Sequence, residues 1–343
     1  MSISNFDLSK EKNGRKRSNF FSRAFSMNEF GIFLALAVLC IALGTAKPTF
    51  FSFTNVMNVL QGITLVGIMA VGEAFVIIAG GIDLSVGSIM SLSGLMIAYL
   101  VHAGVDPTIS LLITLAVGFL CGFFNAFLIV KWKLNPFITT LATMNIYQGF
   151  AYLLTGGMPV QINSYLNFIG HGNIYGVPVS VIIMFFIVLA GHILLTRTVF
   201  GKKVFAVGGN ERAAKLSGIR VENAKFVVYS IVGVLCALAG VISTTNLGIA
   251  DPTAGSSMNL NVIAAVVIGG ASLAGGKGSV IGVLIGAAIM GVLRNGFVLL
   301  RFSIYIQMIS LGVVIILAVL IDIVRNKGNI FVLIRDQIRR NQN

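Results

Sequence analysis

The chain has 343 residues, of which 57% are hydrophobic and only 10% are charged, and its formal net charge is +13. A soluble domain carries about 25% charged residues, so this composition excludes an ordinary soluble protein and predicts a membrane protein. An uncharged stretch runs from Leu134 to Thr196, which is enough for two crossings of about 20 residues each. The basic residues cluster at the chain ends and in short loops. In a membrane protein this clustering indicates the cytoplasmic side rather than nucleic-acid binding.

Apolar runs bounded by charges or turn residues predict an all-α polytopic membrane protein with about ten transmembrane helices. We expect a basic cytoplasmic tail (1–29), a membrane domain (30–324) and a second basic tail (325–343). The first run could instead be a cleaved signal peptide, but it is longer than the apolar region of a usual one. In chain order, the expected crossings are 30–46, 56–79, 85–104, 108–130, 137–156, 178–196, 226–248, 259–275, 279–299 and 303–324.

The distribution of basic residues predicts the orientation of the chain. If the N-terminus is cytoplasmic and the crossings alternate, only Lys47, Arg294 and Arg301 of the 24 Lys and Arg residues lie on or near the outer side. Cytoplasmic loops of membrane proteins carry an excess of Lys and Arg. We therefore expect both termini in the cytoplasm, an even number of crossings and a large cytoplasmic loop at 197–225.

Two acidic residues, Glu73 and Asp83, lie in or beside predicted crossings. A carboxyl group at membrane depth is costly and usually faces a cavity or a partner. Gly80-Gly81 should break one helix, and Asp83 or Ser85 should cap the next. Both a capped turn at the cytoplasmic interface and a broken helix near a translocation path fit this pattern. For Glu73, a neutral carboxyl group that bonds to a neighbouring helix is the alternative to a functional role.

Four strings of residues occur in an order that resembles a known family. They are GGIDLSVGS at 80–88, LNPFITTL at 134–141, GGNERAAKLSG at 208–218 and VVIGGASLAGGKG at 266–278. Together they resemble the permease subunits of monosaccharide ABC importers, which serve ribose, arabinose, allose and galactose. These subunits are related more distantly to branched-chain amino acid permeases. The resemblance covers nearly the whole chain after the N-terminal tail.

The resemblance implies a permease subunit, not an enzyme, in the bacterial plasma membrane. It would move a monosaccharide from a periplasmic or extracellular sugar-binding protein into the cytoplasm. The implied partners are a second copy of the permease, a cytoplasmic ABC ATPase and the sugar-binding protein, with no nucleic acid. No cofactor is expected, because the ATPase binds the ATP. The stretch 271–278 approaches a nucleotide-binding loop but lacks its first glycine and its final hydroxyl residue.

The 197–225 loop contains a predicted short helix. Asn210 suits its N-cap, Gly218 suits its end, and a Glu211–Lys215 pair has helical spacing. The resemblance implies that this is the coupling helix that docks on the ATPase, whereas packing on the protein's own cytoplasmic face is the alternative. The predicted coupling residues are Asn210, Glu211, Arg212, Ala213, Ala214, Lys215, Leu216, Ser217 and Gly218.

Uncharged polar residues in the middle crossings are candidates for contact with a sugar, because they can replace water without adding charge. Bonding between helices is the alternative role. These residues are Asn125, Thr139, Thr140, Thr143, Asn145 and Gln148, in addition to Glu73, Asp83 and Ser85.

Three other functions are alternatives to this interpretation. An ion-coupled secondary carrier would need a titratable site at depth, and Glu73 is the only deep candidate. A permease for another small polar solute would share the same features. An intramembrane hydrolase is disfavoured, because the sequence has no GxSxG or HExxH string. The residues do not identify the sugar.

Overall fold

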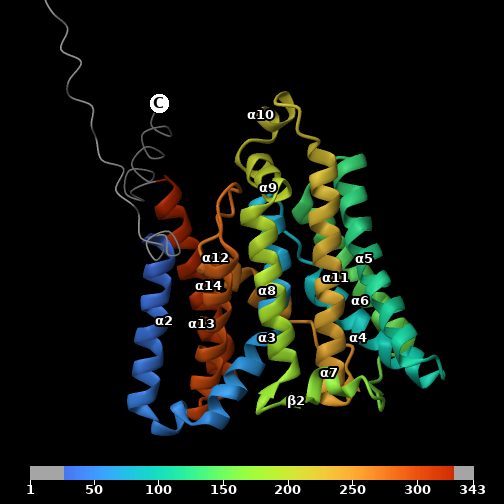
Figure 1. Cartoon of the computed structure of the whole chain (residues 1–343), viewed down its shortest axis with the longest axis vertical. Coiled ribbons are helices and arrows are strands. Elements are labelled where there is room, and N and C mark those ends of the chain that lie inside the picture. The colour runs from blue at the N-terminus through green and yellow to red at the C-terminus, as the bar shows by residue number, and fades with distance from the viewer. Residues whose placement is uncertain (1–26, 328–343) are drawn as a thin grey trace, which may run out of the picture.

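The computed structural model describes residues 27–327, so most of the two basic tails expected at 1–29 and 325–343 lies outside the described residues. The predicted all-α architecture is confirmed (Figure 1). The longer helices are α2 (Met27–Ala46), α3 (Phe53–Ile78), α4 (Val86–His102), α5 (Pro107–Lys131), α6 (Pro136–Thr155), α8 (Val179–Arg197), α9 (Val199–Gly209), α11 (Val221–Leu247), α12 (Met258–Ile268), α13 (Val280–Leu299) and α14 (Ile304–Lys327).

Short elements join these helices at both ends of the molecule. They are the 3-10 helix η1 (Pro48–Phe51), the helices α7 (Asn167–His171) and α10 (Glu211–Leu216), and the strands β1 (Val160–Gln161), β2 (Asn173–Ile174), β3 (Val177–Pro178) and β4 (Ile249–Ala250). The strands form two antiparallel pairs, in which Val160 lies opposite Ala250 and Asn173 opposite Pro178.

Each predicted crossing contains one helix, but the number of crossings is not confirmed. Within the described residues, seven helices are long and apolar enough to span a bilayer: α2, α3, α5, α8, α11, α13 and α14. The apolar helices α4 and α12 are shorter, and the 20-residue helix α6 is not among the seven. The predicted crossing 259–275 is wrong in extent, because α12 ends at Ile268 where Gly269 and Gly270 follow.

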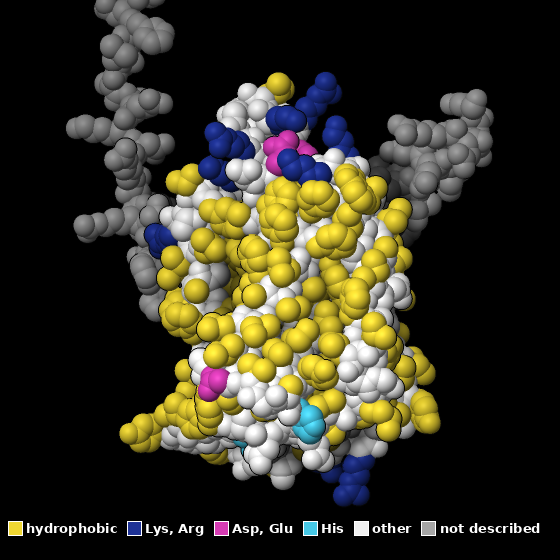
Figure 2. All heavy atoms as spheres, turned by 90° about the vertical axis from the view of Figure 1, so that its right-hand side faces the viewer, with side chains coloured by type: hydrophobic (Ala, Val, Ile, Leu, Met, Phe, Trp, Pro, Cys, Tyr) yellow, Lys and Arg dark blue, Asp and Glu magenta, His cyan; other side chains and the backbone are white. Residues whose placement is uncertain are grey.

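The arrangement of the helices matches the charge pattern of the sequence. In Figure 1, α2 begins and α14 ends at the end of the molecule that carries α10, while α7 and β2 lie at the opposite end. Figure 2 shows a broad belt of hydrophobic side chains on the face of α5, α6 and α11, with Lys and Arg gathered at the α10 end. A bilayer covers such a belt and leaves the charged end in water.

The helices differ strongly in how deeply they lie in the protein. The span in α3 is 83% buried and that in α11 is 67% buried, whereas those in α2 and α14 are each only 6% buried. Glycines allow α5 and α11 to approach closely, because a Cβ on Gly118 would lie 2.5 Å from the carbonyl oxygen of Gly233. These glycines therefore serve close packing of the two helices.

The helices α3 and α12 end in the same way. Gly80 has a φ of 84° and Gly270 a φ of 86°, the left-handed conformation that ends many helices. The amide of Gly80 donates to Ile77, and that of Gly270 donates to Val267, each bond being 2.9 Å long. Each helix therefore stops at a Gly-Gly pair, at 80–81 after α3 and at 269–270 after α12.

Candidate functional site

The break between α3 and α4 places irregular backbone inside the protein. After the left-handed turn at Gly80, residues 81–85 run without regular structure until α4 begins at Val86. Asp83 and Ser85 in this segment are completely buried. Irregular backbone at membrane depth is tolerated where protein or a cavity satisfies its polar groups. Here the surrounding protein does so.

Asp83 is the centre of a buried polar network. Its Oδ1 accepts hydrogen bonds from the amide of Ser85 (2.8 Å) and from Ser85 Oγ (2.6 Å). Asn125 on α5 donates through Nδ2 to Asp83 Oδ2 (3.2 Å) and to Ser85 Oγ (2.8 Å). The hydroxyl group of Tyr147 on α6 lies 3.0 Å from Asn125 Oδ1. The network therefore links the broken segment to two further helices.

Glu73 ties the end of α3 to the same segment. Its Oε1 accepts a 3.0 Å hydrogen bond from the amide of Asp83, while its Oε2 is buried and has no partner in the described part of the chain. The hydroxyl group of Tyr229 on α11 is likewise buried without a partner among the described residues. An unpaired buried polar group costs about 1–3 kcal/mol. Within residues 27–327, Glu73 Oε2 and the Tyr229 hydroxyl group therefore lack hydrogen bonds, whereas both carboxylate oxygens of the neighbouring Asp83 have partners.

The structure brings together four of the predicted pathway residues, Glu73, Asp83, Ser85 and Asn125. Thr140 joins them, because its hydroxyl group lies 3.2 Å from the carbonyl oxygen of Ile82. The remaining candidates on α6 do not join the network. Thr139 and Thr143 bond to their own helix, and Asn145 is exposed and bonds to Leu141.

The helix cap and two of the tyrosines in this region differ from what the sequence predicts. The predicted helix cap is wrong: Ser85 is the N-cap residue of α4 but its side chain makes no capping bond, and Asp83 bonds to Ser85 before the helix begins. Tyr147 and Tyr229 could not be predicted as part of this site, because a tyrosine in an apolar run is not distinguishable from an ordinary core residue.

A second candidate region is α10, which follows α9 directly. Asn210 Oδ1 accepts a 2.9 Å bond from the amide of Ala213, and Gly218 has a φ of 80°, so the predicted cap and stop are confirmed. The predicted Glu211–Lys215 pair is wrong. Glu211 instead binds Lys225 at 2.7 Å, and Lys215 lies 3.5 Å from Glu222. Both charged side chains of the predicted pair reach across to α11 instead of to each other.

One face of α10 packs on the protein and the other is open. Ala214 is buried with Val207, Val221 and Ala224. Leu216 is 85% exposed, and the other residues of the helix are exposed as well. Packing on the protein's own surface therefore occupies only one residue of α10, and most of the helix is left available for a partner.

The last turn of α9, which leads directly into α10, touches the end of α3. Gly208 lies so close to Ile78 that a Cβ there would be 1.7 Å from the Ile78 carbonyl oxygen. The same carbonyl oxygen accepts a 2.9 Å bond from the amide of Gly276, in the loop between α12 and α13. Three turns that are distant in sequence therefore meet beneath α10.

Long apolar helices, a broken helix buried at their core and an exposed helical loop at the basic end define a multispan membrane protein of the transport class. The family model of the permease component of branched-chain amino acid transport systems matches residues 55–319, and the chain belongs to this family. The family is one of transport components rather than enzymes. No solved structure matches the chain.

Several curated proteins are similar to this chain over most of their length. The ribose import permease of Bacillus subtilis (strain 168) is 43% identical over 299 residues, which cover 86% of this chain and 93% of that protein. The ribose import permease of Escherichia coli (strain K12) is 42% identical, covering 88% and 96%. The D-allose transport system permease of the same strain is 37% identical, covering 88% and 94%. None of these comparisons supports the homodimer expected from the sequence.

Proposed function

We propose that this chain is the membrane-spanning permease subunit of an ATP-binding-cassette importer that brings a monosaccharide into the bacterial cytoplasm. The observation that carries this proposal is the similarity to ribose and allose import permeases over at least 86% of the chain. The subunit forms the passage and performs no chemistry, and a pentose or hexose of the ribose and allose kind is its substrate.

The partners follow from the same reasoning. A separate ATPase subunit binds the ATP and docks on α10, and a sugar-binding protein delivers the sugar at the opposite end of the molecule. The exposed face of α10, with Leu216 85% exposed, supports the docking assignment. The permease itself needs no cofactor.

The orientation that fits this function has the α10 end in the cytoplasm. The 197–225 loop, Lys131, Lys133 and Lys277 then lie on the side that membrane proteins enrich in basic residues. Both chain ends are cytoplasmic, and α4, α6 and α12 complete ten passes. The short α12 completes its pass together with the irregular segment 251–257.

The buried network has a structural part in this function. Glu73, Asp83, Ser85 and Asn125 are fully buried, so they hold the helix break in place instead of lining an open path in this conformation. Movement of the 81–85 segment would open or close the passage. The ion-coupled carrier is the weaker alternative, because family membership assigns the energy to a partner and Glu73 has no exposed surface.

The proposal is tested by ATP hydrolysis in a reconstituted assembly. The ATPase subunit and the sugar-binding protein of the same organism are combined with the permease in lipid vesicles. We expect sugar to stimulate hydrolysis only when all three proteins are present. Equal stimulation by sugar in vesicles that lack this chain would overturn the proposal.

A further inference from the structure

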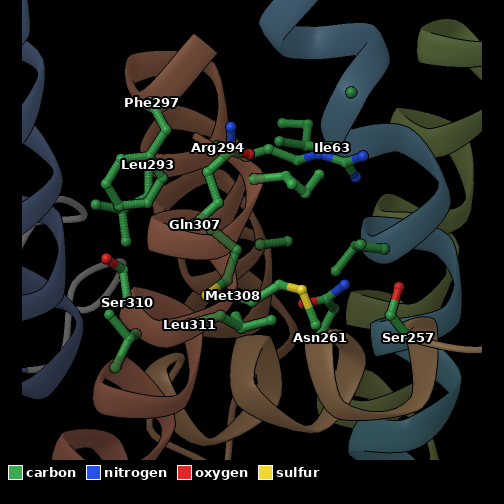
Figure 3. Close-up of a pocket in the computed structure, with 17 residues that line it drawn as sticks. Ile63, Ser257, Asn261, Leu293, Arg294, Phe297, Gln307, Met308, Ser310 and Leu311 are labelled. Carbon is green, nitrogen blue, oxygen red and sulfur yellow. The ribbon is translucent and has the colours of Figure 1, made fainter. Parts of the chain in front are cut away.

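A cavity of about 180 Å³ lies between α3, α12, α13 and α14 (Figure 3). Its polar lining comes from Ser257, Asn261, Arg294, Gln307 and Ser310, and the ring of Phe297 lies at its edge. Because α3 ends beside Gly208 at the base of α10, the earlier part of α3 that lines the cavity lies farther from α10. The cavity therefore opens in the part of the membrane domain that faces away from the coupling helix.

The cavity reaches into the apolar layer of the membrane. The helix α12 has 11 residues, which corresponds to about 16 Å at 1.5 Å per residue. A bilayer core is about 30 Å thick. Since the loop after α12 reaches the α10 end through Gly276, the first turn of α12 must begin inside the layer and not at its edge. Ser257 is the N-cap residue before that first turn, and Asn261 lies within the turn.

The polar groups around the cavity lack partners within the protein. In the part of the chain that the structure describes, the side chains of Ser257, Asn261 and Arg294 form no hydrogen bond or ion pair; Ser257 and Arg294 are exposed, and Asn261 and Gln307 are half-buried. Gln307 donates one 3.2 Å bond to Phe302 and leaves its own carbonyl oxygen unused there. The half-buried amides of Asn261 and Gln307 therefore need water or a polar solute to complete their hydrogen bonds.

Neighbouring polar side chains behave differently. Asn55 on α3 and Asn295 on α13 bond to each other at 2.9 and 3.1 Å, and Gln61 donates to Asn246 on α11 at 2.9 Å. These residues hold helices together. The contrast identifies the groups around the cavity as available for a ligand, although Arg294 lies directly beside the paired Asn295 on α13.

The lining selects for a neutral polyhydroxy compound. It contains no Asp or Glu and a single cation, Arg294. The amides of Asn261 and Gln307 each offer donors and an acceptor, which is what a hydroxyl group of a sugar needs. The ring of Phe297 offers an apolar surface to the C–H face of a sugar. A metal cation would find no carboxylate here, and an acyl chain would leave the amides unpaired.

The irregular segment before α12 is held in place by two other helices. Gln148 on α6 donates a 2.8 Å bond to the carbonyl oxygen of Pro252, and the amide of Gly255 donates a 2.8 Å bond to Ser91 Oγ on α4. These bonds set where Ser257 and Asn261 lie. Gln148, a predicted sugar contact, thus bonds to the backbone next to the cavity.

We propose that this cavity is a binding station for the transported sugar, with Asn261 and Gln307 as its main contacts. The inference rests on the proposed function and adds the site within the permease. It places the sugar against α12 and α14 and away from the buried Asp83 network. A permease must release its substrate. A few uncharged contacts, which bind the sugar weakly, therefore suit this binding site better than a charged site of high affinity.

The first test compares sugar uptake by matched variants of the full assembly, normalised to permease in the membrane. Asn261→Leu keeps the volume of the side chain and removes its hydrogen bonds. Asn58→Leu makes the same change at an exposed position of α3 that lies outside the lining of the cavity. We expect uptake to fall about tenfold or more for Asn261→Leu and to stay within about twofold for Asn58→Leu. Equal uptake by both variants, whether normal or reduced, would overturn the inference.

A second pair of variants tests whether uptake requires the cavity to be empty of protein side chains. Ser310→Phe places a ring in the cavity, whereas Gly312→Phe places the same ring on another side of α14, where no atom lies within 4 Å of an added Cβ. We expect uptake to fail only for Ser310→Phe. If this variant does not reach the membrane, Ser310→Cys in a Cys40→Ala background gives an independent measurement, since Cys121 and Cys236 are buried.

The cysteine variant is labelled with a water-soluble maleimide in the presence of ribose or of inorganic phosphate at equal concentration. We expect ribose to slow the labelling at least about threefold and phosphate to have no effect. Protection by phosphate alone would show an anion site at Arg294 and overturn the inference. If even the unaltered assembly shows no ATP-dependent uptake, the proposed function fails as well. Normal uptake in Asn261→Leu would overturn the cavity assignment alone.

Discussion

At the scale of single residues, the buried carboxyl groups explain how a helix can be broken inside a membrane protein. Asp83 satisfies the amide and hydroxyl group of Ser85, and Glu73 satisfies the amide of Asp83. Without these acceptors, the amides of the irregular segment would be buried and unpaired, at a cost of about 1–3 kcal/mol each. The two acids therefore replace the helical hydrogen bonds that the break removes.

Two substitutions of Glu73 distinguish the role of its hydrogen bond from the role of its titratable carboxyl group. Glu73→Gln keeps an oxygen for the amide of Asp83, so we expect normal insertion and nearly normal uptake. Glu73→Leu leaves that amide unpaired and should reduce uptake more than it reduces protein in the membrane. Uptake across pH, normalised to membrane protein, is the measurement. Loss of uptake in Glu73→Gln with intact ATP hydrolysis would favour an ion-coupled carrier instead.

Asp83 should be more sensitive to removal than to neutralisation. Asp83→Asn keeps an acceptor for the Ser85 amide, whereas Asp83→Ala leaves that amide, Ser85 Oγ and Asn125 without it. We expect Asp83→Ala to destabilise the protein by about 2 kcal/mol or more and Asp83→Asn to have a smaller effect. Thermal unfolding in detergent measures the difference, and an equal loss in both variants would contradict the account of the network.

At the scale of elements, a contact joins the end of α3 to the last turn of α9, which leads directly into α10. The carbonyl oxygen of Ile78 leaves no room for a side chain at Gly208. The end of α3 also carries Glu73, about two turns before the break. If the ATPase docks on α10 as proposed, this contact is the mechanical link from α10 to the buried network.

Gly208 and Gly209, the last two residues of α9, provide a matched test of this link. A Cβ at Gly208 would lie 1.7 Å from a backbone oxygen, whereas one at Gly209 would have no atom within 4 Å. We expect Gly208→Ala to lower sugar uptake per ATP hydrolysed and Gly209→Ala to leave this ratio unchanged. An unchanged ratio in both variants would show that the contact does not transmit coupling.

Two proline substitutions test the coupling helix in the same manner. Ala214→Pro removes a backbone donor inside α10 and clashes with the preceding turn, which costs about 3 kcal/mol locally. Glu211→Pro places proline at the first helical position, where it is tolerated. We expect only Ala214→Pro to abolish sugar-stimulated ATP hydrolysis while still inserting normally. Stimulation at the normal rate in Ala214→Pro would show that α10 is not the coupling helix.

The positions of the helices could be predicted because each apolar run ends in a local signal, such as Asn135 and Pro136, which cap and begin α6. Contacts between distant segments could not. Asn125 meets Asp83 only because α5 packs beside the break, and Lys225 displaces Lys215 as the partner of Glu211 only because α11 lies under α10. The end of α12 was signalled by Gly269 and Gly270, but the apolar residues around them suggested a longer crossing.

At the scale of the whole molecule, the burial of the helices separates a core from a periphery. The break follows the deeply buried α3, and the polar network joins it to α5 and α6. The helices α2 and α14 are only 6% buried and present their apolar surfaces to lipid or to another protein. The basic α10 end is set against an apolar belt (Figure 2). This arrangement suits a transport subunit whose ATPase docks at the basic end.

The central claim is that ATP hydrolysis by a partner subunit drives sugar through this chain. The most direct measurement is accumulation of labelled ribose in vesicles that contain the permease and the ATPase, with the sugar-binding protein outside and ATP inside. The account predicts accumulation against a gradient with ATP and none without it. Accumulation driven by an imposed proton gradient in the absence of ATP would contradict it.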